Sequence, residues 1–312
     1  MHAPTLLASF PTPLAEWKLQ VQIQQALSNK LTGLIQITFH DNKTETIFVR
    51  NGIVQSLYLR NHRLPNLDWD SPIGRYGRGT LVIEPLPPRA LMFRKVILEE
   101  ITAAKPQPSG TNQLKTMFNL AEHNPNPTLF HIRWEKAEGF VLVAGGHLPV
   151  RQSVFITSLL NEEGNLAYEH MAIWEESRCQ VTVYRGDIKN QAWLEMHLNI
   201  LFEWYCSYIL THYGQLTGSV MVQSIVRRVF MSGMQVGLNI EPMKTELRDA
   251  SLFPSASDAA LAYRAILHSI KTQVEPVVGR SLTEALMKQS LVPVRGVYKT
   301  IQETFGLIEE LP

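Results

Sequence analysis

The sequence predicts an α+β fold in which two similar antiparallel meander-plus-helix units stand in tandem and an all-α helical bundle follows. Three observations support this prediction. Residues 33–60 have the pattern of three short strands joined by two tight turns. A diverged version of the same order of elements recurs at residues 129–156, and after residue 213 the apolar residues repeat only at helical spacing. The predicted domains are residues 1–104, 112–213 and 214–312, with a linker at 105–111.

The first meander is defined by its turns. Residues 34–39 form an apolar, β-branched run, and the turn formers Asp41-Asn42-Lys43 allow the chain to reverse. Residues 46–49 supply the second strand. Asn51-Gly52 then accepts the positive φ angles of a type I′ turn, and residues 53–59 supply the third strand.

Helices and a fourth strand complete the first unit. We expect a helix from Pro13 to Asn29, a loop after Arg60, a strand from Thr80 to Glu84, and a helix from Ala90 to Thr102. The segment Lys105 to Thr111 is rich in proline, serine and glycine and lacks large apolar residues, which is typical of a linker.

The second unit repeats this order. Its expected elements are a helix at 114–122, strands at 129–134, 140–143, 150–156 and 180–184, and a helix at 191–213. Gly145-Gly146 takes the place of Asn51-Gly52 between two of the strands. We interpret the repetition as an internal duplication with diverged sequence.

The C-terminal third is predicted to contain four helices. They are expected at residues 218–237, after a cap at Ser257, from Ser281, and from Pro293 to a stop at Gly306. Four helices are enough for a bundle.

Aromatic residues surround the helix at 191–213. Trp193, Trp204, Tyr205 and Tyr208 are spread around its circumference, so one small sheet cannot cover them all. The C-terminal bundle is one cover and a second copy of the chain is the other. We favour a homodimer, and we take these four residues as interaction candidates.

The amino-acid composition limits the classes of function that we expect for this protein. The net charge is +1, with 45% hydrophobic and 18% charged residues, which fits a soluble globular protein and argues against nucleic acid as a partner. The two cysteines, Cys179 and Cys206, are too few for a disulfide framework. With no signal-peptide pattern and no membrane-length apolar run, we expect a cytoplasmic protein without membrane insertion.

Several groups of reactive residue types each have a structural explanation. Cys206 with His197 or His212 lacks the spacing of metal ligands on one helical face. The loop at 74–79, with Arg75 and Arg78, lacks the Lys-Ser/Thr and the helix of a phosphate-binding loop, so we treat these two arginines as interaction candidates on a basic surface loop. Asp68-Trp69-Asp70 has no base or nucleophile nearby, and GxSxG is absent. We therefore expect no catalytic, cofactor or metal residues.

The first unit resembles the PATAN-type domains of bacterial signalling proteins. The residues that carry the resemblance are Thr32-Gly33, Phe48, Asn51-Gly52-Ile53-Val54 and Ser56. It covers roughly Pro13 to Thr102 and, more weakly, the second unit. The resemblance implies a non-enzymatic interaction module of regulators, often joined to a receiver domain, of which this sequence has none.

The expected function is therefore a non-catalytic cytoplasmic adaptor or regulator in bacterial signalling, with another signalling protein as its partner. Two alternatives stay open. One is a DNA-binding regulator that uses Arg227 and Arg228 on the helix at 218–237. The other is an enzyme or small-ligand binder that uses the cleft between the two units.

Overall fold

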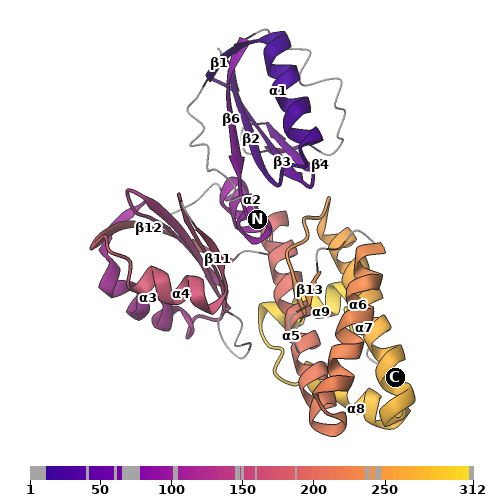
Figure 1. Cartoon of the computed structure of the whole chain (residues 1–312). Helices are drawn as coiled ribbons and strands as arrows, with labels where there is room; N and C mark the ends of the chain where they lie inside the picture. Colours follow the sequence, from indigo (N-terminus) through magenta and orange to yellow (C-terminus); the bar gives the residue numbers. More distant parts are fainter. Residues whose placement is uncertain are drawn as a thin grey trace.

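Two antiparallel sheets and a helical bundle make up the fold, which confirms the predicted α+β class (Figure 1). The computed structural model describes residues 12–39, 42–59, 62–64, 78–100, 105–144, 148, 151–158, 160–186, 188–235, 238, 240–242 and 247–308. Within these residues each of the two large sheets has six strands.

The first unit is a sheet with one helix before its central strands and one after them. Its strands are β1 (Thr12–Ala15), β2 (Gly33–Phe39), β3 (Thr44–Arg50), β4 (Ile53–Leu59), β5 (His62–Arg63) and β6 (Arg78–Pro85). Its helices are α1 (Glu16–Ser28) and α2 (Pro88–Glu99). The strand order is β1-β6-β2-β3-β4-β5, and every neighbouring pair is antiparallel.

The second unit has the same plan with one helix added. Its strands are β7 (Gln107–Gly110), β8 (Thr128–Arg133), β9 (Ala137–Val143), β10 (Arg151–Thr157), β11 (Asn161–Glu163) and β12 (Arg178–Arg185). A short 3-10 turn (Thr111–Gln113) leads into α3 (Leu114–Ala121), and α4 (Asn165–Ala172) is the addition. The order β7-β12-β8-β9-β10-β11 matches the first sheet strand for strand, which supports the predicted duplication.

Helices cover both faces of each sheet. In the first unit α1 packs on one face through Leu19 and Ile23, while α2 lies against Phe48 and Tyr58 on the other. In the second unit α3 and α4 share one face (Figure 1), and apolar side chains of the other face join the cluster that contains α2 and α5 (Gln191–Thr217). Successive side chains of a strand point to opposite faces, which is why Leu129 and Phe130 enter different clusters.

The bundle is built around α5. Around it lie α6 (Ser219–Gln235), α7 (Ala256–Val278), α8 (Arg280–Leu291) and α9 (Val297–Phe305), together with the small hairpin β13 (Ile240–Pro242) and β14 (Leu247–Asp249). Because Asn199 and Glu203 of α5 also accept hydrogen bonds from Gln152 of the second sheet, this helix contacts both parts. Among the described residues, no helix combines the length and apolar character that a membrane span requires.

Two segments form edge strands instead of the predicted structures. Thr12–Ala15 is not the first turn of a helix, since it pairs with β6 as β1. The predicted linker contains β7, which pairs with β12. Each strand carries a proline, Pro13 or Pro108, and an edge strand is where a sheet tolerates a residue that has no N–H to donate.

The helix ends also differ in detail from the prediction. Ser255, and not Ser257, caps α7 by accepting a hydrogen bond from the Asp258 N–H at 3.2 Å. Pro276 lies inside the last turn of α7, and Gly279 ends that helix. The last helix begins at Val297, after Gly296, and not at Pro293.

Candidate functional site

The Asn51-Gly52 turn has the predicted geometry. Its φ angles are 49° at Asn51 and 76° at Gly52, as a type I′ turn requires. The Asn51 N–H donates to Thr32 Oγ1 at 3.0 Å, and the Gly52 N–H donates to the Leu31 carbonyl at 2.8 Å. The two short motifs, Thr32-Gly33 and Asn51-Gly52, therefore meet at one end of the first sheet.

Both glycines of these motifs lie where no side chain fits. A Cβ atom on Gly52 would stand 2.1 Å from the Leu27 carbonyl oxygen at the end of α1. A Cβ atom on Gly33 would stand 2.1 Å from the Glu84 carbonyl oxygen in β6. Close backbone approach thus accounts for these glycines, without any ligand.

A groove of about 330 Å³ lies beside this turn, between the first unit and the helical bundle. We call it the turn groove. Its lining residues come from the β3–β4 hairpin on one side and from α6 and the segment after it on the other: Arg50, Asn51, Ile53, Gln55, Phe230, Met234, Leu238 and Ile240. The groove is therefore composite and exists only while the two parts hold their relative position.

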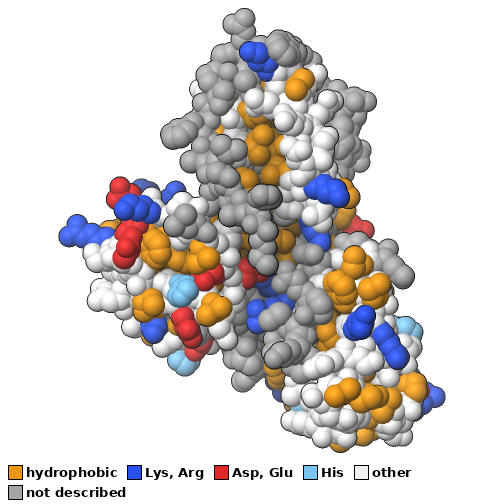
Figure 2. Space-filling model, in the orientation of Figure 1, with side chains coloured by type: hydrophobic (Ala, Val, Ile, Leu, Met, Phe, Trp, Pro, Cys, Tyr) orange, Lys and Arg blue, Asp and Glu red, His pale blue; other side chains and the backbone are white. Residues whose placement is uncertain are grey.

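Apolar side chains are exposed at the turn groove. Ile53 is 66% exposed and Met234 is 58% exposed, and Met231, one turn earlier on α6, is also exposed. Figure 2 shows hydrophobic side chains gathered on the bundle just below the first unit. Grouped apolar exposure of this kind marks interaction surfaces, and the flexible methionine side chain adapts to different partners.

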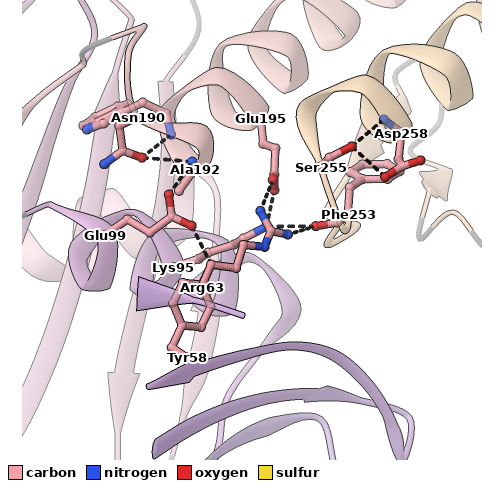
Figure 3. Close-up of polar contacts among 11 residues, drawn as sticks. Tyr58, Arg63, Lys95, Glu99, Asn190, Ala192, Glu195, Phe253, Ser255 and Asp258 are labelled. Carbon is pink, nitrogen blue, oxygen red and sulfur yellow. Dashed lines mark hydrogen bonds and ion pairs between the residues drawn. The ribbon is translucent and has the colours of Figure 1, made fainter. Parts of the chain in front are cut away.

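A buried charge cluster fixes the first unit against the bundle (Figure 3). Glu195 of α5 accepts hydrogen bonds from Lys95 of α2 and from Arg63 of β5, the latter at 2.8 Å. Both cations also donate to the Phe253 carbonyl ahead of α7. Burial lowers the pKa of Lys95, and the charge of Glu195 opposes that shift.

The end of α2 also caps the start of α5 (Figure 3). Glu99 accepts hydrogen bonds from the Tyr58 hydroxyl at 2.6 Å and from the Ala192 N–H at 2.8 Å. Asn190 accepts from the same N–H at 2.9 Å. Burial, followed by the charge of Glu99, raises the pKa of Tyr58 well above its usual range, so this hydroxyl stays a donor.

A second buried cluster joins all three parts of the fold. Glu203 of α5 accepts from Arg89 of α2 at 2.9 Å and from Gln152 of β10 at 2.7 Å. The same carboxylate accepts from the Asp249 N–H of β14 at 3.1 Å. Asp249 in turn accepts from the Tyr263 hydroxyl at 2.7 Å, and burial raises the pKa of its carboxyl to about 6.

Helix α2 therefore makes contacts with all three parts of the fold. Besides Arg89 and Lys95, it carries Arg94, which donates to Glu84 of the first unit at 3.1 Å and to Glu138 of the second at 2.7 Å. Its Phe93 ring lies 5.9 Å from that of Phe140. Side chains of α2 thus fill the space between the two sheets. An enzyme or small-ligand binder that uses a site between the two units would require a cleft in that space.

The aromatic candidates on α5 are mostly interior. Trp193 and Tyr205 are fully buried. Trp204 is half-buried and donates from Nε1 to the Ser290 carbonyl at 3.0 Å, and half-buried Tyr208 stacks on His212 at 4.1 Å. The cover comes from α2 and the C-terminal helices within one chain, so these aromatics do not require a second copy.

The loop candidates lie mainly outside the described residues. This holds for Arg75, Asp68-Trp69-Asp70 and the predicted Gly145-Gly146 turn, and Arg78 is described only as the first residue of β6. In the part of the chain that is described, no three His, Cys, Asp or Glu side chains gather so as to hold a metal ion. Cys206 is fully buried, and burial raises the pKa of its thiol.

The groove residues Ile53, Phe230 and Met234 were not among the predicted interaction candidates. Part of the signal was present in the sequence, because Met231 and Met234 fall outside the buried stripe of α6 that contains Val222 and Val229. No family model, curated protein or solved structure matches this chain.

Proposed function

We propose that this protein is a non-catalytic cytoplasmic adaptor or regulator in bacterial signalling, and that it works by protein contacts at the turn groove. The observation that carries the proposal is the exposure of Ile53 and Met234 at a groove built from two parts of the fold. Its volume suits one or two large apolar side chains, so the expected occupant is an apolar anchor segment of a second signalling protein.

The composite nature of the turn groove supports a regulatory role. One wall belongs to the unit that resembles a signalling module, and the other belongs to the bundle. The clusters at Glu195 and Glu203 set the distance between these walls. The affinity of a partner that binds there depends on the relative position of the two parts, and an adaptor can transmit a signal through that dependence.

Site-specific photo-crosslinking in the native cell tests the proposal. A photoreactive amino acid at Met234 should capture one defined protein, while the same group at Leu120, an equally exposed apolar position on α3, should not. The captured protein is then purified and its affinity measured by calorimetry. Ile53→Asp should weaken binding by about tenfold or more, because it places a charge against an apolar anchor.

The control for that measurement is Leu120→Asp, which adds the same charge at a position that is 65% exposed in the second unit. It should leave the affinity unchanged. Equal crosslinking from both positions, or a partner that binds Ile53→Asp as tightly as the natural chain, would contradict a site at the turn groove.

A further inference from the structure

A second groove, on the opposite part of the bundle from the first unit, has a different chemistry. It holds about 300 Å³ and lies between α7, α8 and the chain that follows α9. Its floor is apolar and consists of buried side chains: Leu267, Met287, Leu307 and Ile308. Leu261, which is 68% exposed, extends this apolar surface along one rim.

Basic residues follow the α7 rim. Arg264, His268 and Lys271 line the groove at spacings of four and three residues, so they form one row along the helix. The row is about 10 Å long at 1.5 Å per residue. Among the described residues these three side chains form no ion pair within 4 Å; Arg264 and His268 are exposed and Lys271 is half-buried.

The one carboxylate among the described lining residues is already engaged. Glu284 of α8 pairs with Arg280 one turn earlier, at 2.7 Å, and Arg280 does not line the groove. The hydrogen bond and charge of Arg280 lower the pKa of Glu284, and the charge of Lys271 adds to that effect, so this carboxylate offsets part of the charge on the rim. One carboxylate faces the two cations Arg264 and Lys271, and the α7 edge therefore keeps a net positive charge. An apolar floor with one cationic edge calls for a ligand that has an apolar face and a row of negative charges.

We propose that this groove binds an acidic amphipathic segment of a partner protein, with one apolar side chain on the floor and carboxylates along the α7 rim. Charge complementarity selects the acidic peptide, because a purely apolar peptide would leave the net positive charge of the α7 rim unbalanced. The shape supports a peptide too, since a row of about 10 Å matches carboxylates two helical turns apart. The site is separate from the turn groove and does not depend on it.

Fluorescence anisotropy with a synthetic peptide tests this inference on the full chain. The probe is a labelled peptide of about 14 residues, long enough for helical structure, made of glutamate, leucine and alanine with the glutamates along one face. Binding is expected at low salt and should weaken as ionic strength rises. The same peptide with glutamine in place of glutamate should not bind.

Matched variants locate the site. Arg264→Glu with Lys271→Glu should weaken binding by about tenfold or more, and Leu261→Asp should also weaken it. The control is Arg227→Glu with Arg228→Glu, which makes the same charge change on the exposed face of α6. All of these positions are exposed or half-buried, and thermal melting checks that each variant is folded.

Three results would overturn the proposal. One is an equal loss of binding in the α6 control, which would show that the loss of peptide binding comes from the net charge of the protein and not from the groove. Another is equal binding of the glutamine peptide. The third is peptide binding only to a chain that ends at Ile308, which would assign the groove to the acidic residues Glu309 and Glu310 of the same chain.

Discussion

Gly52→Ala should destabilise the first unit by about 2 to 4 kcal/mol, through two separable effects. The first is conformational: Gly52 has a φ of 76°, where an L side chain costs about 1 to 2 kcal/mol. The second is steric. The added Cβ would stand 2.1 Å from the Leu27 carbonyl oxygen, although ordinary contact begins at 3.4 Å, so the turn must move away from α1.

That movement also weakens the hydrogen bond from the Gly52 N–H to the Leu31 carbonyl, now 2.8 Å long. The bond contributes about 1 kcal/mol. Gly306→Ala separates the two effects, because Gly306 has a φ of 56° and a ψ of 51°, in the left-handed helical region, and no atom lies within 4 Å of the place that its Cβ would take. It should cost only the conformational part, so Gly52→Ala should be the more damaging by about 1 kcal/mol or more.

Urea unfolding gives the two free energies, and hydrogen exchange shows where protection is lost. For Gly52→Ala the loss should fall on α1, β2, β3 and β4. If the two alanine variants were equally destabilising, or if exchange in the first unit were unchanged, the close contact with Leu27 would not be what makes glycine necessary there.

Local signals predicted the meander well. The apolar run at 34–39 and the Asn51-Gly52 turn involve residues close together in sequence, so pattern and turn chemistry suffice to place β2, β3 and β4. The edge strands were missed because their evidence is not local. Pro13 and Pro108 look like a helix start and a linker until β6 and β12 are known to lie beside them.

The buried ion pairs of α2 could not be predicted from the sequence. Arg89 and Lys95 occupy an amphipathic helix, where cations normally face the solvent, yet both are nearly inaccessible. Their acceptors, Glu203 and Glu195, are about a hundred residues later in the chain. Only the docking of α2 on α5 brings them together.

The turn groove was hidden for the same reason. Ile53 and Met234 belong to different parts of the fold, and neither is unusual alone. The pattern around Trp193 did predict a helix buried on several sides. It left open what covers that helix, because periodicity identifies apolar faces and not their neighbours.

Two further predictions concern the buried clusters. Arg89→Met should cost about 3 to 5 kcal/mol in urea unfolding, because it leaves Glu203 buried without its cation, and adding Glu203→Gln should restore part of the loss. The pKa of Asp249 is about 6 in the folded protein, whereas in the unfolded chain the carboxyl keeps its ordinary pKa of 3.8. The folded state therefore binds its proton more tightly, and the stabilisation by this group, fully present below pH 3.8, is lost as pH rises through 6. Compared with Asp249→Asn, the natural chain should lose about 3 kcal/mol of stability between about pH 4 and pH 7. Parallel pH profiles for the two proteins would show that burial does not shift this carboxyl.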